Sequence, residues 1–239
     1  MSTLVPRPHA STDSKQFASG VAAFLTSLSL DLELPDGFRI LDPYRHDEVV
    51  DVVRQFCTTY YAGNQNRVAV WGINPGRFGA GVTGLSFTDP VALVDLLGLR
   101  TTITGRREPS AQFVSMVIEA YGGPKAFYHD FYLSALSPLG FESGGKNINF
   151  YDDADLARRI APLIRAWMLE QHSLGLVEDR CVVLGTGKLR DYMERTLRQD
   201  LPYTTVEYLE HPRFIMQYRR RRLSEFVDKY VETLLRIKG

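Results

Sequence analysis

Two polar side chains follow predicted strands of this sequence, at positions where they could do chemistry together. Residues 68–71 are apolar and include two valines, which predicts a buried strand, and Asn74 follows in a glycine-rich loop. His211 comes directly after another predicted strand, residues 204–209. Because the carboxyl ends of parallel strands share one edge of a sheet, we expect both side chains at one ligand site. A carboxamide can orient a water molecule, and an imidazole N–H can stabilise negative charge on a leaving group.

The loop after residues 68–71 carries a specific motif. Residues 74–87 follow the pattern N-P-G-x-F-G-x(3)-T-G-x-x-F. This pattern resembles the first motif of the single-strand-selective monofunctional branch of the uracil-DNA glycosylase superfamily. The resemblance covers only this stretch, and it implies a three-layer α/β/α fold and cleavage of the N-glycosidic bond of a base in DNA.

The resemblance assigns roles to the two polar residues. Asn74 stands where the family places the residue that positions the attacking water, and the bond breaks through an oxocarbenium-like transition state. His211, before Pro212, stands where a family histidine hydrogen-bonds a carbonyl oxygen of the departing base. The alternatives are a turn-forming asparagine before proline and a structural histidine. We expect Asn74 and His211 to be catalytic.

The resemblance also predicts a base-binding set. Phe87 would stack on an extruded base, with an ordinary core phenylalanine as the alternative, and Gly76 would leave room at C5 of a pyrimidine. Ala135 occupies the position of the family asparagine that pairs with the base edge, so Ser134, Asn147 or Asn149 would have to replace it, and a range broader than uracil is expected. The predicted substrate-binding residues are Gly72, Ile73, Pro75, Gly76, Phe78, Phe87, Ser134 and Asn147.

Contacts to DNA are predicted from three other stretches. The family sequence H-P-S-P-R-N is replaced by HPRFIMQYR, so the wedge into the duplex is open among Arg213, Phe214 and Ile215, with Arg213 favoured. Arg219 and Arg220 begin a run of four arginines, for which a solvated basic face is the alternative. Residues 185–188, which end in Lys188, lack the first glycine of a P-loop but could hold a DNA phosphate with backbone N–H groups. The predicted DNA-binding residues are Arg213, Phe214, Arg219, Arg220 and Lys188.

The surrounding pattern predicts an α/β fold with a central, mainly parallel four-stranded sheet between two helical layers. The expected strands are 68–71, 131–139, 181–184 and 204–209, and residues 140–149 are expected to form a polar loop. Among the expected helices, one begins with Ser110 as its N-cap, one is divided or kinked at Pro162, and the last begins at the arginine run. No linker divides residues 1–239, so we expect one domain with a loose tail at 1–13.

Composition narrows the class of protein. The chain has 239 residues, 28 Lys plus Arg and 28 Asp plus Glu, so its overall charge favours neither DNA nor any other partner. Its two cysteines show no ligand spacing, which excludes the four-cysteine iron–sulfur relatives and favours a reduced, cytoplasmic protein without metal or cofactor. Residues 17–30 are too short and too polar to span a bilayer. We expect a monomer whose partner is single- or double-stranded DNA.

The sequence therefore predicts a monofunctional DNA glycosylase that releases uracil and related deaminated or oxidised bases in base-excision repair. No lysine is placed as a nucleophile, so strand nicking is not expected. Two alternatives stay open. A non-catalytic nucleic-acid-binding protein would not need both Asn74 and His211, and a nucleoside or nucleotide hydrolase would not need the arginine run.

Overall fold

A four-stranded parallel sheet forms the centre of the molecule. The computed structural model describes residues 14–30, 32–63 and 66–239, so the tail predicted at 1–13 lies outside the described residues. The sheet has the order β3-β2-β6-β7, with parallel pairing throughout. Its strands are β2 (Arg67–Gly72), β3 (Phe131–Ala135), β6 (Leu176–Leu184) and β7 (Thr205–Leu209). The predicted parallel sheet is confirmed, and β2, with neighbours on both sides, is buried along its whole length.

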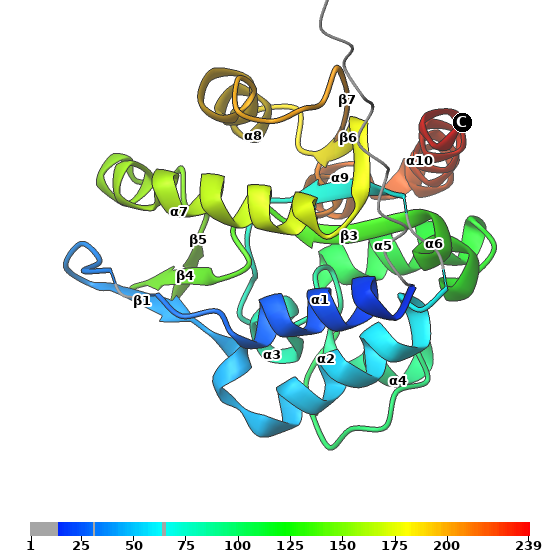
Figure 1. Cartoon of the computed structure of the whole chain (residues 1–239), viewed down its shortest axis with the longest axis horizontal. Helices are drawn as coiled ribbons and strands as arrows, with labels where there is room; N and C mark the ends of the chain where they lie inside the picture. Colours follow the sequence, from blue (N-terminus) through cyan, green and yellow to red (C-terminus); the bar gives the residue numbers. More distant parts are fainter. Residues whose placement is uncertain (1–13, 31, 64–65) are drawn as a thin grey trace, which may run out of the picture.

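Helices cover both faces of this sheet (Figure 1). On one face, the ring of Phe17 in α1 (Ser14–Thr26) meets the ring of Tyr132 in β3 at 5.8 Å, edge to face. The hydroxyl of the same Tyr132 donates to Oε1 of Gln171 in α7 (Ala154–Ser173) at 2.8 Å. On the other face, α5 (Pro109–Ala120) and α10 (Leu223–Lys238) close an apolar layer over Val70 and its neighbours. These layers confirm the predicted α/β/α architecture.

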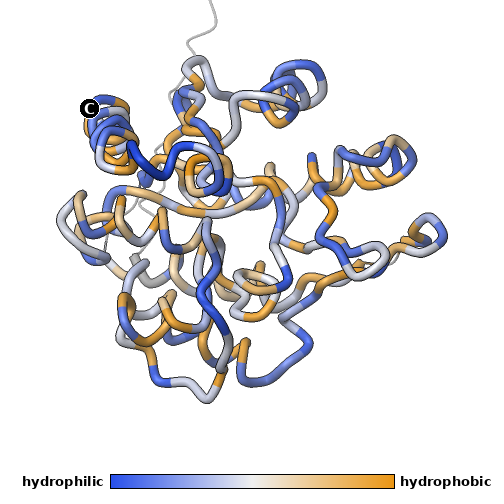
Figure 2. The backbone as a smooth tube through the Cα atoms, turned by 180° about the vertical axis from the view of Figure 1, so that it is seen from behind, coloured by the Kyte–Doolittle hydropathy of each residue, from blue (hydrophilic) through white to orange (hydrophobic). Residues whose placement is uncertain are grey.

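The remaining helices are shorter or lie at the ends of the layers. In the described part of the chain they are six α-helices, two 3₁₀ turns and one π-helical turn. Their bounds are α2 (Asp47–Tyr60), α3 (Ala80–Thr83), α4 (Pro90–Asp95), α6 (Pro124–Asp130), α8 (Lys188–Tyr192), α9 (Pro212–Tyr218), η1 (Pro43–Arg45), η2 (Met193–Leu197) and η3 (Arg220–Arg222). Hydrophobic segments gather toward the middle of the molecule, whereas the stretch between α9 and α10 is strongly hydrophilic (Figure 2).

A second, three-stranded antiparallel sheet corrects the loop predicted at 140–149. It has the order β1-β4-β5, made by β1 (Phe38–Leu41), β4 (Gly140–Ser143) and β5 (Lys146–Ile148). Gly144 and Gly145 turn the β4–β5 hairpin with φ of +55° and +73°, which glycine adopts at little cost. The glycines that suggested a loop are thus turn residues of a hairpin. Phe141 and Ile148 pair across the hairpin and pack against the apolar core. The polar residues between them are the other reason that the sequence suggested a loop.

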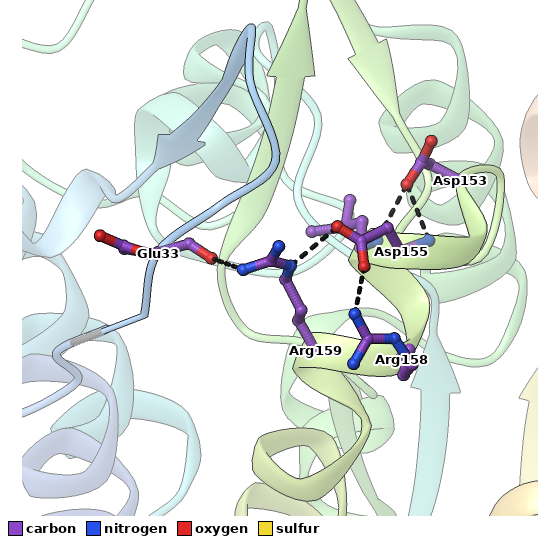
Figure 3. Close-up of polar contacts among 6 residues, drawn as sticks. Glu33, Asp153, Asp155, Arg158 and Arg159 are labelled. Atoms are coloured by element: carbon purple, nitrogen blue, oxygen red, sulfur yellow. Dashed lines mark hydrogen bonds and ion pairs between the residues drawn. The ribbon is translucent and has the colours of Figure 1, made fainter.

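Charged side chains fasten the segment before β1 to the beginning of α7 (Figure 3). Asp153 caps α7 by accepting hydrogen bonds from the backbone N–H groups of Asp155 and Leu156. Arg159 donates to the carboxylate of Asp155 at 2.8 Å and to the backbone oxygen of Glu33 at 3.1 Å. This network joins the small sheet to the helix that follows the hairpin.

Three helix boundaries differ from expectation. Helix α5 is capped by Glu108, which accepts from the N–H of Ala111, because Pro109 occupies the first helical position in place of the predicted Ser110 cap. Helix α7 continues through Pro162, which lies on its exposed side. The arginine run does not begin α10, because the unpredicted α9 and η3 precede Leu223.

Candidate active site

The predicted motif forms a tight loop at the carboxyl end of β2. The carbonyl of Gly76 accepts hydrogen bonds from the N–H groups of Gly79 and Gly81, at 3.1 and 2.9 Å. A side chain at Gly81 would press its Cβ to 2.8 Å from that same oxygen, which explains why glycine is needed there. The hydroxyl of Thr83 donates to the carbonyl of Thr88 at 2.8 Å and shapes the second half of the motif. These bonds hold the loop open toward one cavity.

Both predicted catalytic residues line this cavity, which we call the base pocket. It has a volume of about 90 Å³ and lies at the carboxyl end of β2. Because β3 follows β2 on one side of it and β6 lies on the other, the strand order changes direction at β2, which is where open α/β sheets bind ligands. Of the predicted residues, the base pocket contains Ile73, Asn74, Pro75, Gly76, Phe87, Asn147, His211 and Arg213. The structure therefore brings the loop after β2, the β4–β5 hairpin and the segment after β7 to one place.

The carboxamide of Asn74 is held at both ends by the chain that follows the hairpin. Its Oδ1 accepts the backbone N–H of Phe150 at 3.1 Å. Its Nδ2 donates to the backbone oxygens of Ile148 and Pro75, each at 3.2 Å. These bonds fix which atom is oxygen, and a carbonyl oxygen has a second lone pair that can accept from water. The side chain is thus oriented before any ligand arrives.

His211 presents a neutral donor to the base pocket. Its Nδ1 accepts the backbone N–H of Arg213 at 3.1 Å and caps α9, so the ring proton resides on Nε2. Burial and, to a smaller extent, the positive charge of Arg213 together lower the pKa of His211 to about 4. The imidazole is therefore uncharged near neutral pH, and Nε2–H is available as a hydrogen-bond donor.

Phe87 stands against the end of β2 in an unusual backbone conformation. Its φ is +52°, a value that a bulky residue adopts only when its surroundings enforce it. A Cβ on Gly72 would lie 2.6 Å from the Phe87 ring, so glycine is required there for the ring to reach its place. Gly72 thus acts through Phe87 and does not itself line the base pocket.

The base-edge position behaves partly as expected. Ala135 lines the base pocket and offers no polar group. Ser134 does not line it, because its side chain points to the other face of β3 and donates to Gln171 at 2.5 Å. Asn147 lines the pocket, and its Oδ1 accepts the N–H of Arg77 at 3.1 Å. A Cβ on Gly76 would lie only 3.0 Å from the Nδ2 of Asn147. The glycine therefore leaves space for the amide group of Asn147 in the pocket wall.

The remaining predicted residues lie outside the base pocket. The ring of Phe78 lies in a neighbouring groove. Lys188 and Phe214 line a second neighbouring cavity, in which Lys188 pairs with Asp152 at 2.9 Å. Arg219 ends α9 with its guanidinium 5.3 Å from the exposed ring of Phe214, and Arg220 lies in η3.

Five residues that line the base pocket were not predicted as site residues from the sequence, namely Gly79, Ala80, Ser86, Glu108 and Ser110. Glu108 and Ser110 come from the start of α5, where the carboxylate accepts the hydroxyl of Ser110 at 3.1 Å. Ser86 belongs to the motif loop, and Gly79 belongs to its turn. The signal for Glu108 was its position before Pro109, which is typical of a helix N-cap but says nothing about the cavity it faces.

Residues 14–30, 32–63 and 66–239 contain neither a metal-binding group of side chains nor a membrane-spanning helix. In this part of the chain, no three His, Cys, Asp or Glu side chains gather as a metal-binding group. Nor does any helix there combine the length and apolar character that crossing a bilayer requires. Cys57 and Cys181 are both buried and unpaired with each other.

Known proteins resemble this chain over most of its length. The family model for the Uracil DNA glycosylase superfamily matches residues 59–235. The crystal structure of wild-type SMUG2 from Pedobacter heparinus is 38% identical to the chain and superposes with a TM-score of 0.87. That match covers 91% of this chain and 96% of the other. None of the curated proteins compared with the chain matches it. The chain therefore belongs to the uracil DNA glycosylase superfamily, and its resemblance to the single-strand-selective monofunctional branch is confirmed.

Proposed function

We propose that the protein is a monofunctional DNA glycosylase that hydrolyses the N-glycosidic bond of uracil and related deaminated or oxidised bases. The observation that carries the proposal is the convergence of Asn74, Phe87 and His211 on one pocket. A base held against Phe87 would leave as an anion, with its oxygen accepting from Nε2–H of His211. Asn74 would accept from a water molecule and aim it at the sugar carbon that the base leaves.

The neutral state of His211 suits this role. A donor that is neutral in the resting enzyme stabilises the departing base without transferring its own proton early. The carboxamide of Asn74 is a poor proton acceptor, so it can orient the water molecule but cannot deprotonate it. Most of the activation barrier therefore belongs to departure of the nucleobase. The reaction yields an abasic site and needs no lysine nucleophile, so the strand stays intact. We place this activity in a cytoplasmic monomer that uses no metal or cofactor.

The base range is proposed to extend beyond uracil. Ala135 cannot hydrogen-bond a base edge, and a pocket that lacks this partner discriminates less. Because Gly76 has no side chain, the pocket wall near Asn147 is not filled from that position. This supports the proposal that the pocket accepts a base with a hydroxymethyl group on C5. The Nδ2 of Asn147 is the donor that would meet the edge of the base.

One experiment tests the proposal directly. The purified protein is incubated with matched oligonucleotides that contain uracil, 5-hydroxymethyluracil, xanthine or hypoxanthine, and abasic sites are then revealed with alkali. We expect cleavage of the uracil strand only after alkali, and release of at least one further base. The Asn74→Ala/His211→Ala double variant is the control for contaminating activity. Absence of abasic sites in every substrate would refute the activity, and strict selectivity for uracil would refute the broader range.

The alternatives make different demands on the site. A non-catalytic reader would have no use for an oriented carboxamide beside a neutral imidazole donor. A nucleoside hydrolase would release uracil from free deoxyuridine. Its rate would depend little on salt concentration, because a free nucleoside, unlike a DNA strand, releases no counterions on binding. Free deoxyuridine is therefore included as a fifth substrate, and it is expected to remain intact.

A further inference from the structure

A second groove continues from the base pocket on one side. It has a volume of about 630 Å³ and shares three wall residues with the pocket, namely Glu108, Asn147 and Arg213. A ligand that fills the base pocket can therefore extend into the groove without leaving the surface. The neighbouring segment before α5 is strongly hydrophilic (Figure 2).

The groove is strongly cationic. Five of its wall residues are basic, and one, Glu108, is acidic. The Glu108 carboxylate is engaged by the start of α5, where it accepts from the N–H of Ala111 at 2.9 Å. Arg107 pairs with Asp95 at 2.9 Å. The charges that remain belong to Arg77, Arg106, Lys146 and Arg213, and none of these pairs with a carboxylate in the described part of the chain.

Phe78 organises two of these cations. The guanidinium carbon of Arg106 lies 3.6 Å from the centre of its ring, and that of Arg77 lies 4.6 Å from it. Arg77 also donates to the backbone oxygen of Gly145 in the hairpin turn. An aromatic face that gathers two guanidinium groups keeps like charges close together without an anion. Such an arrangement favours a polyanion as ligand.

Another cavity, which shares Ile73, Asn149 and His211 with the base pocket, has a different character. It has a volume of about 360 Å³ and contains one lysine, Lys188, which pairs with Asp152 at 2.9 Å. The positive charge around the base pocket is thus unequal between the groove and this cavity. A strand whose target base sits in the pocket would meet four unneutralised cations in the groove, whereas the lysine of the other cavity is already paired.

We propose that the groove of Arg77, Phe78, Arg106, Lys146 and Arg213 binds the phosphodiester backbone of the target strand on one side of the excised nucleotide. This inference rests on the proposed function, because it uses the base pocket as the anchor of the strand. It assigns a contact site to Arg106 and Lys146, and it predicts that excision depends more on phosphates in one direction from the base than on those in the other.

A scan with neutral methylphosphonate linkages tests this asymmetry. Single linkages within three nucleotides of uracil, on either side, are replaced one at a time in a single-stranded oligonucleotide, and single-turnover excision is measured. We expect replacement on one side to slow the wild-type protein at least about fivefold, the loss of one charge-assisted contact. In the Arg106→Ala/Lys146→Ala variant that sensitivity should disappear. The Arg54→Ala/Lys125→Ala variant removes the same charge from exposed positions of α2 and α6 and should keep it.

Binding provides a measurement that does not need catalysis. Fluorescence anisotropy with a single-stranded oligonucleotide should show that Arg106→Ala/Lys146→Ala flattens the slope of log K against log salt by about 1.4, for two lost phosphate contacts. Equal sensitivity on both sides of the uracil, or an unchanged profile and slope in the variant, would overturn the inference even if excision proceeds. Loss of excision from every substrate would instead refute the proposed function, and the binding slope would still decide the groove.

Discussion

The imidazole of His211 lies against the ring of Phe87, with the two ring centres 5.9 Å apart and the planes inclined by 46°. One ring follows the last strand of the parallel sheet, and the other ends the motif after the central strand. Together they form two walls of the base pocket, one with an N–H donor and one with an aromatic face. The distance leaves the two groups able to act on different parts of the same bound base.

We predict that Phe87→Ala lowers single-turnover excision about fivefold to 150-fold, because stacking on a base contributes ~1–3 kcal/mol. Gly72→Ala should produce a similar loss, since the new Cβ would stand 2.6 Å from the Phe87 ring and displace it. Combining both substitutions should cost little more than Phe87→Ala alone, which rate measurements on the four proteins can show. Fully additive losses would mean that Gly72 acts independently of Phe87.

We predict that His211 is neutral at pH 6, with its proton on Nε2, because burial and the nearby charge of Arg213 lower its pKa to about 4. The imidazole ¹⁵N chemical shifts report both the charge and the tautomer. Since the folded pKa is below the ordinary value of 6.5, the unfolded chain binds more protons between these two values. The contribution of His211 to the free energy of unfolding is therefore complete above about pH 6.5 and is lost as the pH falls toward 4.

Urea unfolding of the wild type and of His211→Ala between pH 7 and pH 4.5 separates this contribution from that of other groups. The variant should lose stability less steeply as the pH falls, because it lacks the suppressed imidazole. Parallel curves for the two proteins, or an imidazolium signal at pH 6, would contradict the assigned state of His211.

We predict that Asn74→Ala lowers single-turnover excision at least about tenfold, or roughly 1.4 kcal/mol of transition-state stabilisation. Binding to an abasic-site oligonucleotide should survive, because the groups that contact DNA are unchanged. The N–H of Phe150 loses its acceptor in this variant. Asn74→Ala should therefore also be less stable than the wild type in thermal unfolding. Excision at the wild-type rate would remove Asn74 from the mechanism.

We predict that Arg219→Ala with Arg220→Ala weakens DNA binding for all sequences and flattens the slope of log K against log salt by ~1–2. Both side chains are exposed beyond the end of α9. Arg222→Ala is the matched control, because Arg222 already pairs with Glu225 at 2.6 Å and should matter less. A slope equal to that of the wild type would show that Arg219 and Arg220 do not contact DNA phosphates.

The motif loop could be predicted from sequence because its geometry is local. Asn74 to Phe87 contains its own turn glycines and the Thr83 hydroxyl that shapes it. The four strands could also be located from their apolar residues. The predicted bounds differ for β3, which ends at Ala135, and for β6, which begins at Leu176 because its first half contains charged residues. The parallel order of the strands follows from the helices that alternate with them.

Other parts of the site depend on contacts between distant segments. The β4–β5 hairpin reads as a loop because its glycines are its most visible feature, and its partner β1 lies about a hundred residues earlier in the chain. Ser134 faces Gln171 because strand residues alternate between faces, and a shift of one residue decides which face is reached. Glu108 reaches the base pocket through the placement of α5 against the sheet.

The hydrogen bonds of Asn74 have a consequence for how the enzyme assembles. Two of them reach Ile148 and Phe150, which are 74 and 76 positions further along the chain. Closing so long a loop costs entropy that the local turn of the motif does not share. The carboxamide can therefore gain its orientation only once the hairpin has docked. Amide hydrogen exchange at Phe150 would report how often these bonds open in the native state.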